Sequence, residues 1–235
     1  MTMFINRIAD YDPIYPPAYP IQALNTEASA GTYAMKSIRD YSGEEHNLIT
    51  LATFNSYGMI CTETNTSADT QIKESEQMTF VLALYIPSAP SAARNIISCF
   101  TPNAAPWFGF RLTQGTDGSG TIRVGSGVTG TDSTSLSIGG ITGGWTSFAF
   151  TVSNSAISFL RANGTAGSTE ITVGRGLSTN NIFINGAPPT SPLLTGIDGT
   201  IGGVAVYNAQ LSLSGMTLQI NNMRTFMATK GVVIP

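Results

Sequence analysis

Apolar and polar side chains alternate along most of the chain after Tyr33, a pattern that predicts β-strands. In the segment 77–86, QMTFVLALYI, every second residue is large and apolar. The residues between them are also mostly apolar, so we expect both faces of this strand to be covered. Residues 145–152 and 155–160 repeat the alternation, and residues 200–207 form another predicted strand, whose glycines permit close packing or a bulge.

Turn-forming segments rich in Gly, Asn and Asp separate these runs, as at residues 115–120, 125–133 and 162–168. About a dozen short strands joined by such turns predict an antiparallel sandwich or barrel. Strands and helices do not alternate in the pattern expected of a parallel sheet.

One segment, residues 213–230, has helical spacing instead. The apolar side chains that share one side of it are Met216, Ile220, Met223 and Met227. Ser212 or Ser214 can cap its start, and Lys230 and Gly231 suit its end. A methionine-rich stripe can serve as a groove for a partner, but we expect this helix to pack on its own domain.

Residues 1–32 differ in kind from the rest of the chain. Prolines fix their own φ angle and restrain the preceding residue, so this segment is predicted to be an extended arm that precedes a domain of residues 33–235. The candidate contact residues of the arm are Tyr11, Tyr15, Pro16, Pro17 and Tyr19. We expect the arm to pack along a neighbouring subunit; the alternative is that it folds back over its own domain.

The amino-acid composition argues against some classes of binding partner. Only 11% of the 235 residues are charged, and the net charge is −3. Nucleic-acid binding is disfavoured because it requires a basic stripe that displaces counterions. No apolar run approaches the roughly 18 residues of a membrane helix, and the N-terminus lacks the basic start and apolar core of a signal peptide.

The reactive side chains are few. Cys61 and Cys99 lie in apolar runs and are predicted to be buried free thiols, although a bridge between neighbouring strands is possible. His46, the only histidine, is expected to form hydrogen bonds beside Asp40 and not to act as a base. Glu74 shares a strand face with another glutamate but has no third partner. We therefore predict no catalytic residues, and one histidine with two separated cysteines makes a zinc site improbable.

Three stretches, in order, resemble the laminin-G-like and concanavalin A-like jelly roll. Residues 37–48, SIRDYSGEEHNL, are similar to the family's early turn. The motif GWTSFAF at 144–150, followed by ISFL and ANG at 157–160 and 162–164, resembles its central hairpin. The segment GTIGGVAVYN at 199–208 resembles its closing strand. The resemblance implies an all-β fold, a two-sheet antiparallel jelly-roll sandwich with an extended N-terminal arm and one C-terminal helix.

The resemblance also raises calcium and glycans as ligands. Some domains of this family hold calcium at the rim through aspartates, and Asp40 and Asp198 are the candidates here; the alternative is that they only form turns. No other cofactor is expected. Trp107 and Arg111 lie in the segment PWFGFR, where alternation predicts that they share one face of a strand, so they are the best candidates to contact sugar. Trp145, in the GW motif, is expected to pack in the domain.

The family's phage members are similar in composition and in their proline- and tyrosine-rich arms. We therefore expect a non-enzymatic bacteriophage structural protein, a capsid decoration or tail-fibre subunit in the virion, whose partners are other virion proteins or copies of itself. The alternative is a carbohydrate-binding module that recognises a cell-surface glycan. A polysaccharide-degrading enzyme is disfavoured, because retaining hydrolysis needs two carboxylates about 5 Å apart and the acidic residues are scattered.

Overall fold

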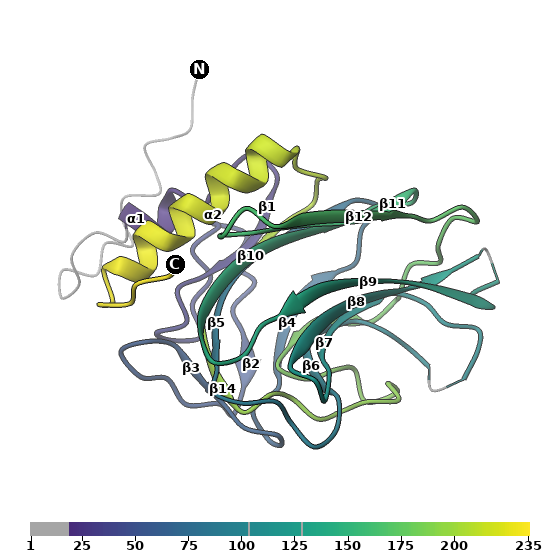
Figure 1. Cartoon of the computed structure of the whole chain (residues 1–235), viewed down its shortest axis with the longest axis horizontal. Coiled ribbons are helices and arrows are strands. Elements are labelled where there is room, and N and C mark those ends of the chain that lie inside the picture. The colour runs from purple at the N-terminus through teal and green to yellow at the C-terminus, as the bar shows by residue number, and fades with distance from the viewer. Residues whose placement is uncertain (1–18, 103, 128) are drawn as a thin grey trace.

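The computed structural model describes residues 19–102, 104–127 and 129–235. Two antiparallel β-sheets pack face to face, and one long helix lies against the outer face of one of them (Figure 1). The all-β sandwich with one C-terminal helix is the fold that the sequence predicts. Neither helix in the described part of the chain has the length and hydropathy needed to cross a membrane.

The first sheet, sheet A, has the strand order β1-β14-β5-β10-β11-β12, and β3 also pairs with β14. Its strands are β1 (Ser29–Tyr33), β3 (Met59–Cys61), β5 (Met78–Ile86), β10 (Gly144–Val152), β11 (Ala156–Arg161), β12 (Ala166–Glu170) and β14 (Gly199–Tyr207). Four of them coincide with the strands predicted from alternation. Both faces of β5 are buried, as predicted, except at Tyr85.

The second sheet, sheet B, has the order β2-β4-β13-β6-β7-β8-β9. Its strands are β2 (Ile49–Thr50), β4 (Ala68–Lys73), β6 (Arg94–Ser98), β7 (Phe110–Gln114), β8 (Ser119–Ser126), β9 (Asp132–Gly140) and β13 (Asn181–Ile184). The predicted turn at residues 115–120 joins β7 to β8, and the predicted turn at 162–168 joins β11 to β12.

The core between the sheets is apolar and aromatic. The ring of Phe80 stacks on that of Phe150 within sheet A at a centroid distance of 4.8 Å, and Phe110 of sheet B packs on Phe80 at 5.0 Å. Cys61 and Cys99 belong to the same core and are both free and buried, as predicted.

Helix α2 (Leu213–Ala228) covers the other face of sheet A, beside strands β5, β10 and β14 (Figure 1). The side chain of Ser212 caps it by accepting a hydrogen bond from the Gly215 N–H at 3.1 Å. The predicted methionine stripe is buried against the domain itself. Close approach depends on the glycines of β14, because a Cβ added at Gly203 would lie 2.7 Å from the sulfur of Met223.

Lys230, just after α2, ties three parts of the fold together. Its ammonium group donates to the carbonyl oxygens of Ala34 at 2.5 Å, Tyr57 at 3.1 Å and Gly202 at 2.7 Å. Only 8% of the residue is exposed. All three N–H groups of the ammonium are therefore used, and the end of α2 is fixed to β14 and to the segments next to β1 and β3.

The N-terminal part of the chain differs from the predicted arm. Short helix α1 (Tyr19–Gln22) lies beside α2, and β1 pairs with β14, so residues 19–32 are part of the sandwich. The predicted boundary at residue 32 falls within β1, because the SAGTY segment is buried and can hydrogen-bond to a sheet edge. Of the predicted contact residues, Tyr11, Tyr15, Pro16 and Pro17 lie outside the described residues, and Tyr19 is the first residue of α1.

Candidate functional site

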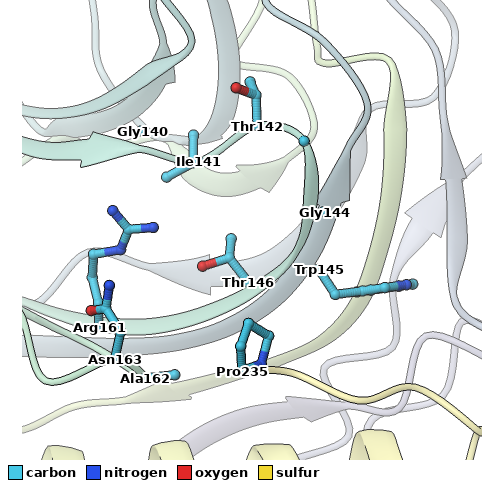
Figure 2. A pocket seen from close by; sticks show the side chains of 11 residues that line it. Gly140, Ile141, Thr142, Gly144, Trp145, Thr146, Arg161, Ala162, Asn163 and Pro235 are labelled. Carbon is cyan, nitrogen blue, oxygen red and sulfur yellow. The ribbon is translucent and has the colours of Figure 1, made fainter.

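A pocket of about 220 Å³ opens at one rim of the sandwich, where the β9–β10 connection, the β11–β12 hairpin and the C-terminus meet (Figure 2). We call it the rim pocket. It is lined by Gly140, Ile141, Thr142, Gly143, Gly144, Trp145, Thr146, Arg161, Ala162, Asn163 and Pro235. In Figure 2, Arg161 and Asn163 lie on one side and Trp145 on the other, with Thr146 between them.

The pocket forms because β10 extends beyond its partner on one side. Pairing of β10 with β5 starts at Gly144, whereas pairing with β11 starts only at Phe148. The Ser147 carbonyl still accepts from the Ala162 N–H at 2.9 Å. Since alternate residues of a strand direct their backbone groups to the same side, the N–H and C=O of Trp145 face this open edge. The strand edge therefore offers a ligand one donor and one acceptor.

Arg161 places a positive charge in the pocket. One of its terminal nitrogens donates to the Ile138 carbonyl oxygen at 3.4 Å, and its Nε is buried without a hydrogen-bond partner. The two ion pairs found among the described residues do not include it. Donors of this guanidinium are thus free to bind a ligand.

An aromatic pair adjoins the pocket. The rings of Tyr85 and Trp145 lie 5.7 Å apart and are tilted, and Tyr85 is 37% exposed. Trp145 is half-buried and packs near Gly202, as expected for a packing residue, but it also lines the pocket. The sequence pattern indicated the first role only.

A second candidate surface lies on the outer face of sheet B. Arg111 of β7 is directly opposite Arg123 of β8, and the alternate residues of both strands point into the core. The guanidinium carbon of Arg111 lies 4.9 Å from the centre of the Phe100 ring. Burial lowers the pKa of Arg111, and the charge of Arg123 lowers it further. We call Phe100, Trp107, Arg111 and Arg123 the arginine face.

Trp107 reaches this face by a route that alternation did not predict. Strand β7 begins only at Phe110, and Gly109 has a φ of +83°, so residues 107–111 do not form one regular strand. Trp107 instead lies in the preceding loop, whose backbone rests on Gly125: a Cβ there would be 2.3 Å from the Trp107 carbonyl oxygen. A Cβ at Gly125 would lie on the same side of β8 as the side chain of Arg123, so the backbone of Trp107 crosses the face of sheet B that carries the two arginines.

Arg123 was missed by sequence reasoning although a signal was present. In the segment TIRVGS, Ile122 and Val124 are apolar and Arg123 lies between them, so alternation assigns the arginine to the outer face. A hairpin with the predicted turn at 115–120 pairs the strand that contains Arg123 with the strand that begins in the PWFGFR segment. Arg111, the last residue of that segment, is the cross-strand partner of Arg123.

The buried acidic residue Glu74 has a structural partner. It forms an ion pair with Arg175 in which both side chains are 0% exposed, and it accepts from the Ser178 N–H at 2.6 Å. Burial raises the pKa of the neighbouring Cys99 thiol well above its usual value, and Glu74 raises it further. A protonated, fully buried thiol is not a nucleophile. The cluster ties the loop before β13 to the end of β4.

The predicted calcium ligands have other partners. Both carboxylate oxygens of Asp40 accept backbone N–H groups, from Thr32 and Ser42 at 2.8 Å each and from His46 at 3.1 Å. Asp198 lies in a separate loop, before β14, and accepts from the Glu63 N–H at 3.1 Å. Asp40 thus organises a turn, with His46 beside it as predicted. Within the ranges that the structure describes, no three His, Cys, Asp or Glu side chains converge as a metal site would require.

Comparison with known proteins shows the fold. No protein-family model matches the chain, and no curated protein matches it either. Among solved structures, the binding domain of Paraclostridial Mosquitocidal Protein 1 is 13% identical, with a TM-score of 0.61 over 83% of this chain and 52% of that one. The binding domain of botulinum neurotoxin DC in complex with SialylT is 10% identical, with a TM-score of 0.60 over 84% and 52%. The chain has the lectin-like jelly-roll fold. It spans about half the length of these structures.

Proposed function

We propose that this chain is a non-catalytic carbohydrate-binding module whose rim pocket holds a single sugar residue at the end of a glycan. The observation that carries the proposal is one small pocket that Trp145 lines together with the polar groups of Arg161, Asn163 and Thr146. Small-molecule sites typically join an aromatic wall to a few placed polar groups. Structures with the same fold include a toxin binding domain in complex with SialylT. Another is from botulinum neurotoxin type C, whose cell entry is dependent upon interaction with two ganglioside molecules.

Sugar chemistry matches the groups that line the pocket. Ring hydroxyls of a pyranose can pair with the Thr146 hydroxyl and the backbone edge of β10, and its apolar face can contact Ile141 and Pro235, which also line the pocket. Asn163 uses its carbonyl oxygen to accept from the Thr165 N–H at 3.1 Å, which leaves the amide nitrogen for the ligand. Arg161 supplies charge-assisted donors, which form the stronger class of hydrogen bond.

Replacing Arg161 with glutamine is expected to weaken glycan binding about tenfold, because a hydrogen bond to a charged donor contributes roughly 1.5–3 kcal/mol. Thr146→Val, which keeps the shape of the side chain, is expected to cost about fivefold. The labelled protein is first screened on an array of immobilised oligosaccharides, and the best ligand is then titrated by calorimetry.

Arg39→Gln is the matched control, since Arg39 is exposed and lies outside the rim pocket. Its affinity should equal that of the unmodified protein. The proposal is rejected if no glycan binds specifically, or if Arg161→Gln and Thr146→Val bind as well as Arg39→Gln does.

A second candidate function is that of a virion structural subunit, with the lectin-like sandwich as scaffold. The observation that favours it is in the sequence: prolines and tyrosines are concentrated in the first 20 residues, and only 11% of the chain is charged. Such an arm suits assembly with copies of this chain or with other virion proteins.

For this second function we expect the full chain to be oligomeric and a chain that begins at Tyr19 to be monomeric, because the sandwich described from residue 19 onwards stays complete. Light scattering coupled to size-exclusion chromatography gives both masses. Equal oligomeric states for the two chains would exclude the arm from assembly.

A further inference from the structure

The arginine face carries two uncompensated positive charges. Arg111 and Arg123 are cross-strand partners, and like charges placed directly opposite each other destabilise a sheet. The ion pairs found in the described parts of the chain are Arg94–Glu63 and Arg175–Glu74, so neither arginine of this face has a carboxylate within 4.0 Å there. Both guanidinium groups stay charged at neutral pH. The fold therefore holds a repulsive pair that a bound anion would neutralise.

Both side chains are held in place before any ligand arrives. Arg111 lies over the ring of Phe100, which is only 2% exposed and so forms a fixed base. Arg123 donates from its Nε to the Ser133 hydroxyl at 3.0 Å. Its two terminal nitrogens take no part in this hydrogen bond. Side chains that are ordered in the free protein lose less entropy on binding.

The groups around the pair fit a sugar polymer. Ser135 is the cross-strand partner of Arg123, and Thr121 and Ser137 form the next pair of β8 and β9. These hydroxyls can contact the hydroxyl groups of a sugar chain. Two arginines on a chain of net charge −3 are too few for the basic stripe that nucleic acid requires.

We propose that the arginine face is a second binding site, separate from the rim pocket, and that it takes an acidic polysaccharide bearing sulfate or carboxylate groups. The guanidinium groups of Arg111 and Arg123 both bind one anionic group that lies between them. Each planar guanidinium can donate two parallel hydrogen bonds to such an oxyanion. The hydroxyls of Thr121, Ser135 and Ser137 contact the adjacent sugar residues. The site lies on sheet B, so it does not depend on the function proposed for the rim pocket.

The test uses the full chain with three immobilised polymers: dextran sulfate, polygalacturonate and neutral dextran. Binding to one or both acidic polymers and not to dextran is expected, and the comparison of the two acidic polymers separates sulfate from carboxylate recognition. Arg111→Gln and Arg123→Gln should each lower the affinity about tenfold, consistent with the loss of a charge-assisted contact. Binding should weaken as the salt concentration rises.

Two controls separate this site from a general charge effect and from the rim pocket. Arg39→Gln removes one exposed positive charge elsewhere, and Arg161→Gln alters only the rim pocket; both should bind dextran sulfate normally. Since Arg123→Gln removes a like-charge contact, its thermal midpoint should be unchanged or higher while its binding falls. Equal binding to dextran and dextran sulfate, or equal losses in Arg39→Gln and Arg123→Gln, would overturn the proposal.

Discussion

Replacing Arg175 with methionine is expected to lower the free energy of unfolding by about 3–5 kcal/mol, because it leaves the carboxylate of Glu74 buried without a counter-charge. Both side chains are 0% exposed. Arg175 also donates to the Ser75 carbonyl oxygen at 2.8 Å, so the substitution frees the loop before β13 from the chain that leads into β5. Urea denaturation followed by circular dichroism measures the loss.

The loss should depend on pH in a defined direction. Burial raises the pKa of Glu74, and the charge of Arg175 opposes that rise, so the pKa increases further once Arg175 is removed. A carboxyl whose pKa in the folded state exceeds the unfolded value of about 4.3 binds a proton on folding. Stability of the variant therefore falls as the pH increases through the window above that value, and the loss is larger at pH 8 than at pH 5.

The ion pair of Arg94 with Glu63 provides a matched control. The side chain of Glu63 is 45% exposed, so Glu63→Gln is expected to cost at most about 1 kcal/mol. A double variant, Glu74→Met with Arg175→Met, should lose less than the sum of the two single changes, because no charge is left buried. A loss in Arg175→Met as small as that in Glu63→Gln would contradict the role given to the pair.

Local pattern was enough to predict four strands of sheet A and the C-terminal helix. Strand β5 carries large side chains at every second position, β10 does so from Phe148 to Val152, and α2 combines a buried methionine stripe with a serine cap. In each case the residues that determine the element are neighbours in the sequence. The buried free thiols were predicted for the same reason, whereas the turn around Asp40 was implied by the family resemblance of residues 37–48.

Contacts between distant segments could not be predicted in this way. Glu74 and Arg175 are 101 residues apart, and nothing in the polar KESEQ segment identifies a partner in the loop before β13. Strand β9 is mostly exposed and rich in Ser, Thr and Gly, so it gives little periodic signal. The arm prediction overlooked β1 because prolines up to Pro20 dominated the composition of residues 1–32. The Trp107 loop depends on the φ of one glycine, Gly109.

Two residues of the candidate surfaces were nevertheless selected from the sequence alone. Trp107 and Arg111 were selected from one short aromatic segment; the structure places Arg111 in β7, opposite Arg123, and Trp107 in the loop before that strand. The rim pocket was not anticipated, since it depends on β10 extending past β11 and on Pro235 returning to that edge. Both features follow from strand register and chain path, which single-sequence patterns do not define.

Replacing Lys230 with methionine is expected to lower the free energy of unfolding by about 3 kcal/mol, because a buried acceptor that loses its donor costs roughly 1–3 kcal/mol and the change affects three. The carbonyl oxygens of Ala34 and Gly202 are buried, and methionine fills the space of the lysine stem without supplying a donor.

Lys230→Met is also expected to affect the rim pocket, through Gly202 and Trp145. Gly202, whose carbonyl binds Lys230, packs against Trp145: a Cβ at Gly202 would lie 2.8 Å from its ring. We therefore expect Lys230→Met to weaken glycan binding at the rim pocket as well as stability, while binding of dextran sulfate at the arginine face is unchanged. Arg39→Met, at an exposed position, is the control for the lost charge and should alter neither property. If Lys230→Met is as stable as Arg39→Met, the three carbonyl contacts do not hold the end of α2 to the sheet.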